Sequence, residues 1–136
     1  MPRPIVVDTN ILFSALLRKQ SPFTETLLAS AHRFHVSELT LAELFKHRQK
    51  IVKLSLLEES EIDALFYKIA RVLEFFKEDL VSPENRKAAY ELCKDIDETD
   101  SPHVALVLEL DGLLWTGDNT LKEGLKKKGF DRFFEP

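Results

Sequence analysis

Four acidic residues, far apart in the sequence, have types and positions that could bring oxygen ligands to one place: Asp8, Glu43, Asp100 and Asp118. Asp8 directly follows the β-branched run Ile5–Val7, and Asp118 directly follows the apolar run 113–117. If both runs are strands of one parallel sheet, their carboxyl ends lie at the same edge, where open α/β sheets form their functional crevice. We therefore expect both carboxylates to point into that crevice.

The other two acids are predicted to lie in or beside helices. Glu43 lies inside the predicted helix 40–53 among apolar neighbours, so we expect its side chain to face a partly buried space. Asp100 ends the acidic loop 95–100, directly before a helix that opens with Pro102. Each acid taken singly has an ordinary explanation, because Asp caps helices and Glu is usually solvated. The prediction of a site rests on all four together.

Four carboxylates gathered in one crevice would repel one another, so such a cluster must bind cations or take up protons. Oxygen-only ligands suit Mg²⁺ or Mn²⁺, and the lone His103 beside the acidic loop does not indicate zinc. One or two such ions activate water and stabilise both the attacking and leaving oxygens of a phosphodiester. Neighbouring polar residues could orient that water or a phosphate: Thr9, Asn10, Thr116 and Asn119.

Short apolar runs alternate with helix-like segments along the chain. We expect strands at residues 5–7, 34–36, 80–81, 113–116 and 133–134, and helices at 11–18, 21–31, 40–53, 58–76, 82–94, 101–110 and 119–128. Thr9 or Asn10 is the expected cap of the first helix, and Asn119 that of the last. This alternation predicts an α/β fold in which helices enclose a mostly parallel sheet.

Length and composition fit one globular domain spanning residues 1–136. Hydrophobic residues make up 44% and charged residues 31%, and the net charge of −4 does not indicate a strongly basic nucleic-acid binder. The single cysteine, Cys93, excludes an intrachain disulfide and suggests a reducing, cytoplasmic location, and we expect it to be buried. The first ten residues lack the apolar core of a signal peptide, and no apolar run would span a membrane.

Four segments resemble, in order, the four motifs of the PIN-domain nuclease family. They are residues 7–12 (VDTNIL), 37–44 (SELTLAEL), 97–106 (DETDSPHVAL) and 114–119 (LWTGDN). The triplet DTN alone is weak, whereas four ordered motifs that span nearly the whole chain are fairly specific.

The resemblance implies a three-layer α/β/α fold and a Mg²⁺- or Mn²⁺-dependent endoribonuclease. The implied metal ligands are Asp8, Glu43, Asp100 and Asp118, with Asn10 and Thr116 as helpers. Asp97 and Glu98 stand beside Asp100, so the position of the third ligand is open. Many small members are VapC-type toxins, commonly dimeric and held in check by a protein antitoxin, and this chain has a suitable size.

Two other functions have to be weighed. A phosphatase of the haloacid-dehalogenase type needs a second Asp two residues after the first, but Asn10 stands there. An inactive PIN-like module that only binds RNA or protein is disfavoured by the four intact acids. RNA contacts could come from two basic runs, although a solvated helix face is the ordinary explanation for each. These runs are Lys46, Arg48, Lys50 and Lys53, and Lys122, Lys126, Lys127 and Lys128.

Overall fold

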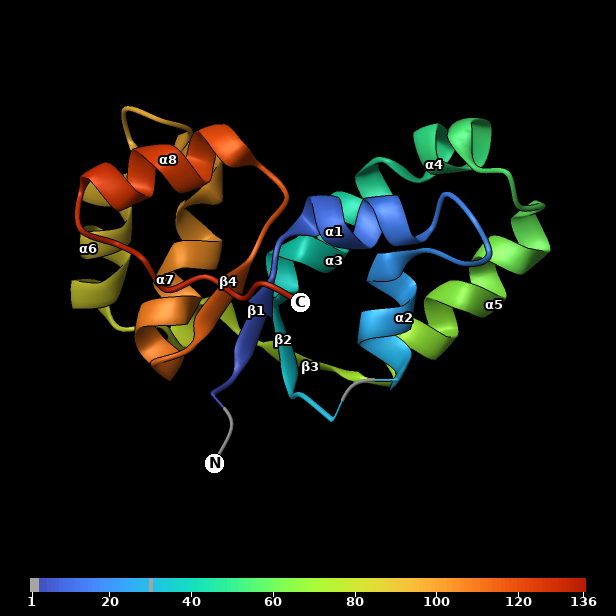
Figure 1. Cartoon of the computed structure of the whole chain (residues 1–136), viewed down its shortest axis with the longest axis horizontal. Coiled ribbons are helices and arrows are strands. Elements are labelled where there is room, and N and C mark those ends of the chain that lie inside the picture. Colours follow the sequence, from blue (N-terminus) through green and yellow to red (C-terminus); the bar gives the residue numbers. More distant parts are fainter. Residues whose placement is uncertain (1–2, 30) are drawn as a thin grey trace.

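A computed structural model describes residues 3–29 and 31–136 (Figure 1). Its centre is a four-stranded sheet in the order β3-β2-β1-β4, and all three strand pairs are parallel. The strands are β1 (Ile5–Val7), β2 (Phe34–Ser37), β3 (Leu73–Phe76) and β4 (Leu113–Trp115). The predicted mostly parallel sheet is confirmed.

Helices cover both faces of this sheet, as Figure 1 shows. On one side lie α1 (Thr9–Ala15), α2 (Pro22–Ala29), α3 (Glu38–Lys46), α4 (Arg48–Leu54) and α5 (Glu59–Ala70), and on the other lie α6 (Pro83–Cys93), α7 (Ser101–Leu110) and α8 (Asn119–Lys127). Strand β1 shows the three layers directly, because Ile5 and Val7 pack into one core cluster and Val6 into the other. The predicted three-layer α/β/α fold is therefore confirmed.

The predicted position of β3 was wrong, as was the predicted end of the helix before it. The apolar spacing that starts at Ile62 continues in helical phase to residue 73, which favoured one helix over 58–76. In the structure α5 ends at Ala70, and Leu73–Phe76 forms β3, which pairs with β2 along its whole length. The expected strand at 80–81 is instead the end of a 3₁₀ turn, Glu78–Leu80, followed by the buried Val81.

Other differences concern where helices begin and end. The predicted helix 40–53 is two helices, α3 and α4, separated at His47. The predicted helix 21–31 ends at Ala29 in the structure, and Ser30 lies outside the described residues, as do Met1 and Pro2. The expected strand 133–134 is a single parallel bridge between Phe133 and Leu114.

The connection from α7 to β4 needs a residue without a side chain. Helix α7 ends at Asp111, which adopts the left-handed conformation (φ 51°). A Cβ atom on the following Gly112 would lie 2.4 Å from the carbonyl oxygen of Pro4. Only glycine therefore lets β4 enter the sheet this close to the segment that leads into β1.

No described helix combines the length and apolar character needed to cross a bilayer.

Candidate metal centre

Asp8 is fixed by hydrogen bonds to two different segments. It directly follows β1 and is 3% exposed. Its Oδ1 accepts a hydrogen bond from the backbone N–H of Asn10 (3.1 Å) and so caps α1, and its Oδ2 accepts one from the Thr116 hydroxyl (2.7 Å). Asp8 itself, rather than Thr9 or Asn10 as predicted, is therefore the helix cap.

Strand β4 positions the next two predicted residues. The register pairs Val7 with Trp115, so that Thr116 lies beside Asp8. The hydroxyl oxygen of Thr116 also accepts a hydrogen bond from the backbone N–H of Asp118 (3.1 Å). The Asp118 carboxylate accepts one from the N–H of Leu121 (3.1 Å), so it caps α8, the role predicted for Asn119.

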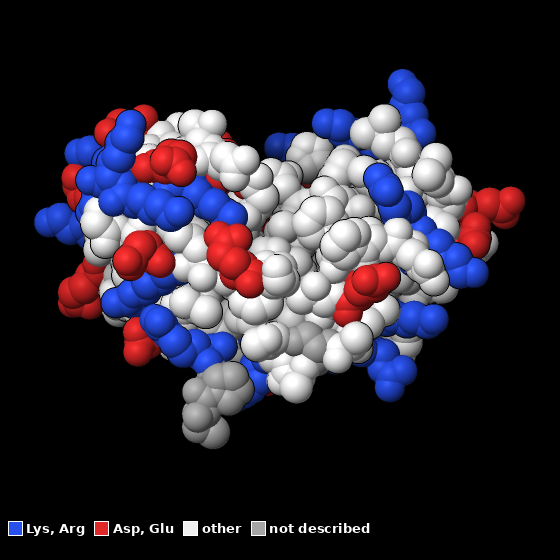
Figure 2. Space-filling view, in the orientation of Figure 1, with Lys and Arg blue, Asp and Glu red and all other residues white. Residues whose placement is uncertain are grey.

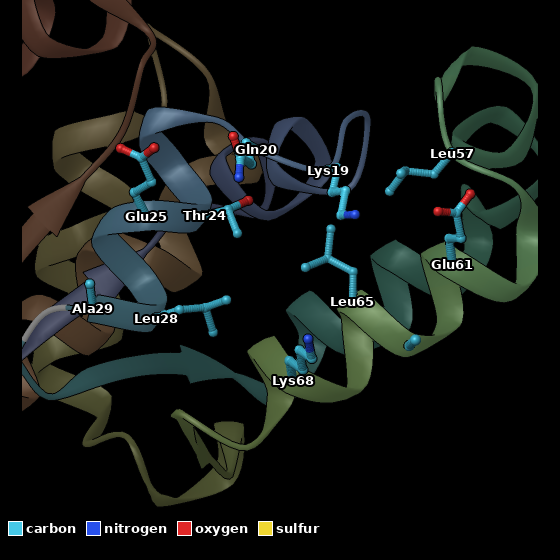
Figure 3. A pocket seen from close by; sticks show the side chains of 11 residues that line it. Lys19, Gln20, Thr24, Glu25, Leu28, Ala29, Leu57, Glu61, Leu65 and Lys68 are labelled. Carbon is cyan, nitrogen blue, oxygen red and sulfur yellow. The ribbon is translucent and has the colours of Figure 1, made fainter.

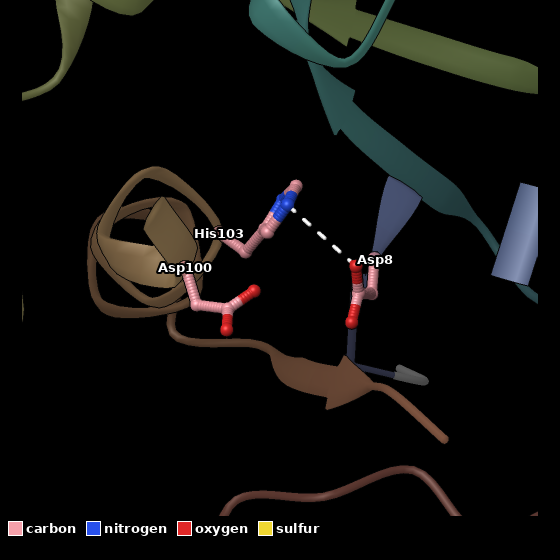
Figure 4. Close-up of side chains that lie close together, drawn as sticks. All are labelled: Asp8, Asp100 and His103. Carbon is pink, nitrogen blue, oxygen red and sulfur yellow. Dashed lines mark ion pairs between the residues drawn. The ribbon is translucent and has the colours of Figure 1, made fainter. Parts of the chain in front are cut away.

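Helix α7 brings two side chains toward Asp8 (Figure 4). Asp100 directly precedes this helix, and His103 lies in its first turn. Ligand atoms of Asp8, Asp100 and His103 all lie within 4.8 Å of one another. His103 is 4% exposed, and its Nε2 lies 3.8 Å from Oδ1 of Asp8 and 3.5 Å from the hydroxyl of Thr9. The three residues form a compact group that we call the Asp8 cluster.

The protonation of Asp100 reflects this crowding. Burial and then the charge of Asp8 raise its pKa from the ordinary 3.8 to about 7. The negative charges of Asp97, Asp118 and Glu43 add smaller contributions in the same direction. Asp8, Glu43 and Asp118 are therefore all close enough to Asp100 to interact with it electrostatically. The cluster offers a buried carboxylate (Asp8), a half-buried carboxylate (Asp100) and an imidazole (His103). These ligands fit a divalent cation, and its positive charge would offset the repulsion between the carboxylates.

Comparisons with known proteins show the family and the fold of this chain. The family model described as PIN domain matches residues 6–134. The chain belongs to the PIN-domain family. Its fold is similar to that of a chain in the crystal structure of VapBC2 from Rickettsia felis bound to a DNA fragment from their promoter. The TM-score is 0.61 and the identity 18%, over 88% of this chain and 92% of that chain. No curated protein matches the chain.

The four PIN-domain motifs reach the centre to different extents. Motif residues Asp8 and Asp100 belong to the Asp8 cluster, whereas Asp118 and Glu43 do not. Glu43, on α3, is exposed and therefore less buried than expected, whereas its apolar neighbour Leu44 is buried. Asn10 is also exposed, and it is its backbone rather than its side chain that contacts Asp8.

Two residues near the PIN-domain centre were not predicted as part of it. Thr40, on α3, is 1% exposed and shares a 3.4 Å hydroxyl contact with Thr9, an arrangement that depends on tertiary packing. His103 did have a signal in the sequence. It stands three residues after Asp100 at the start of a helix, a spacing that places two side chains on the same face.

A separate pocket of about 510 Å³ lies between α2 and α5 (Figure 3). Aliphatic side chains line it, with charged residues such as Lys19, Glu61 and Lys68 among them. None of its lining residues belongs to the Asp8 cluster. The candidate metal centre is therefore at the carboxyl edge of the sheet and not in this pocket.

Proposed function

We propose that this chain is a metal-dependent endoribonuclease that hydrolyses RNA phosphodiester bonds with Mg²⁺ or Mn²⁺, acting as the toxin of a toxin–antitoxin pair. The observation that supports it most is the Asp8 cluster at the carboxyl end of β1, with further acids near enough to raise the pKa of Asp100. Membership of the PIN-domain family supports nuclease chemistry. The VapBC2 fold similarity supports the toxin role.

Asp8 and Asp100 are the proposed carboxylate ligands, and Glu43 and Asp118 surround the same site with negative charge. A bound divalent ion supplies Lewis-acid activation of water and stabilises charge on the phosphate. The protein's own contribution is to orient the ligands. Thr116 holds one oxygen of Asp8, and the N-terminus of α1 holds the other through a hydrogen bond. The carboxylate is therefore fixed before substrate arrives.

RNA contacts are proposed for exposed basic side chains that no ion pair holds within the described residues. Figure 2 shows many Lys and Arg side chains on the half of the molecule that carries α6 and α8. Several have structural partners: Lys122 pairs with Glu135, and Lys128 pairs with Asp95. Lys46, Lys53 and Lys127 are exposed, and no ion pair holds them within the described residues, so these three are the proposed phosphate contacts.

A protein antitoxin and a second copy of the chain are the proposed partners. A groove of about 260 Å³ separates α3 and α4 from α5, lined by apolar residues that include the 64% exposed Phe45. Leu56 and Tyr67 are also strongly exposed, at 84% and 64%. An apolar groove lined by a strongly exposed aromatic side chain is typical of a surface that binds another protein, so the groove beside Phe45 is the proposed contact. A cytoplasmic location remains part of the proposal.

The decisive test is cleavage of a panel of structured RNAs by the purified chain. We expect cleavage with Mn²⁺ or Mg²⁺, none with EDTA, and a loss of at least about 100-fold in Asp8→Asn. Asp79→Asn, an exposed acid in the turn before α6, is the matched control and should keep its activity. RNA that is bound but never cleaved in the presence of metal would instead indicate an inactive binding module.

A further inference from the structure

His103 adds a buried imidazole to the candidate metal centre. Its side chain enters the space between α7 and the end of β1, where Figure 4 shows it beside Asp8 and Asp100. Only 4% of the residue is exposed, so bulk water does not solvate the ring. The only hydrogen-bond contact of the imidazole among the described residues is at 3.5 Å, between Nε2 and the Thr9 hydroxyl.

The protein itself leaves this ring poorly satisfied. Nδ1 is fully buried and finds no hydrogen-bond partner within the described part of the chain. The distance from Nε2 to Asp8 is 3.8 Å, which is too long for a hydrogen bond. An unsatisfied buried polar atom destabilises a fold, so structural packing alone does not explain an imidazole in this position. A cation bound at one ring nitrogen would give the imidazole a strong partner that the described protein groups do not provide.

The spacing of the Asp8 cluster is close to what an ion requires. Its three ligand atoms lie within 4.8 Å of one another. Around a six-coordinate divalent ion such as Mg²⁺, ligand atoms on opposite sides are about 4 Å apart, and adjacent ligand atoms are about 3 Å apart. Small side-chain rotations would therefore be enough to place all three ligand atoms around one ion.

We infer that His103 is a metal ligand, so that Asp8, Asp100 and His103 form a mixed nitrogen–oxygen site that selects Mn²⁺ or another first-row transition ion over Mg²⁺. The inference rests on the proposed metal-dependent function and narrows the choice of ion. Imidazole suits transition ions, whereas Mg²⁺ prefers oxygen ligands and keeps much of its water shell. The oxygen-only site predicted from the sequence becomes a site with one nitrogen donor.

The ligand can be detected directly with Mn²⁺ bound to the full chain, without measuring activity. Pulsed electron paramagnetic resonance reports ¹⁴N coupling when an imidazole nitrogen is bound to Mn²⁺. We expect this coupling in the wild type and its loss in His103→Gln. The matched control is His35→Gln, because His35 is also buried but lies on β2 beside Glu74 (3.1 Å), outside the Asp8 cluster. This control should retain the coupling.

Binding titrations with MnCl₂ and MgCl₂ give the second readout. The wild type should bind Mn²⁺ more tightly than Mg²⁺. Loss of even an outer partner of a metal site costs about 10- to 100-fold in affinity, so His103→Gln should weaken Mn²⁺ binding at least about tenfold. Its Mg²⁺ affinity should change much less, which lowers the ratio of the two affinities.

The outcomes separate this inference from the proposed function. If wild type binds Mn²⁺ at a site that Asp8→Asn removes but shows no ¹⁴N coupling, His103 is not a ligand and the metal-dependent nuclease proposal stands. Coupling that disappears in His35→Gln would also overturn the inference. If wild type binds neither ion, both proposals fail. Should His103→Gln not fold, the wild-type and His35→Gln spectra still decide between these outcomes.

Discussion

Replacing Asp100 by asparagine should stabilise the metal-free protein, although it removes a proposed ligand. Burial and neighbouring negative charges raise the pKa of Asp100 from 3.8 to about 7, so its ionised form is unfavourable in the folded state. Below about pH 4 the carboxyl is protonated in both folded and unfolded chains, and the charge costs nothing. As the pH rises toward 7, the unfolded chain releases this proton and the folded chain retains it, so stability falls. Above pH 7 the loss is complete and constant.

The size of the effect follows from that pKa. A difference of about 3 pKa units corresponds to about 4 kcal/mol of unfolding free energy. Asp100 is only half-buried and lies at the favourable N-terminal end of α7, so we take about half of this value, about 2 kcal/mol. For a domain of this size, that is about 6 °C in melting temperature. The Asp100→Asn substitution removes no helix-capping hydrogen bond, because the Asp100 side chain makes none in the described structure.

Thermal unfolding followed by circular dichroism, with EDTA at pH 4.5, 6 and 8, measures the difference between Asp100→Asn and wild type. The melting temperature of the variant should exceed that of wild type by an amount that grows between pH 4.5 and 7 and then levels off. Glu98→Gln, an exposed neighbour in the same loop, is the control and should show no such trend. With Mn²⁺ the order should reverse, because only the wild type keeps the full ligand set. A variant less stable than wild type at pH 8 in EDTA would refute the reasoning.

Three further predictions concern residues around this centre. Thr116→Val removes the hydroxyl that donates a hydrogen bond to the buried Asp8 carboxylate. It should lower the free energy of unfolding by about 1–3 kcal/mol and also lower the cleavage rate, whereas Thr116→Ser should keep the stability and the rate close to those of the wild type. Chemical denaturation measures the stability, and RNA cleavage measures the rate. Gly112→Ala should lose about 1–3 kcal/mol through a clash with the Pro4 carbonyl, and Gly117→Ala, with no atom within 4 Å, should lose much less stability by the same denaturation assay. Burial raises the pKa of the Cys93 thiol to about 11, so a colorimetric thiol reagent at pH 8 should react with the unfolded chain and not with the native one; rapid native labelling would contradict this.

The sheet was predictable where the strand signal was local and unambiguous. Ile5–Val7 and Leu113–Trp115 are short apolar runs, each followed by polar residues; the first is a buried inner strand, and the second pairs with it at the edge of the four-stranded sheet. Leu73–Phe76 continues a helical apolar spacing, so its own sequence favoured a helix. Its position was decided by hydrogen bonds to Phe34–Ser37, a strand more than thirty residues earlier. Such tertiary pairing overrides local preference and leaves little trace in the segment itself.

In the candidate site, too, some residues could be placed from the local sequence, whereas others depend on tertiary packing. Asp8 was predictable because a strand end fixes both where the residue lies and which way the chain leaves the sheet. The helix-cap explanation and the ligand prediction for Asp8 turned out to be compatible, since one carboxylate can do both. Glu43 was placed in partly buried space from its neighbours alone, but which side of α3 is covered depends on how the helices pack. His103 was not predicted as a ligand because a single histidine beside an acidic loop does not indicate zinc, although its spacing from Asp100 places it near the same site.

The parallel pairing of β1 with β4 has a consequence for how the protein is made. Strand β1 is synthesised long before its neighbour β4, because more than a hundred residues separate the two strands in the sequence. The hydroxyl of Thr116 that holds Asp8 arrives at the same late moment. Until residues 113–116 have been synthesised, the chain can complete neither the β1–β4 pair nor the hydrogen bond that holds the Asp8 carboxylate, so the candidate centre forms only after this later segment folds.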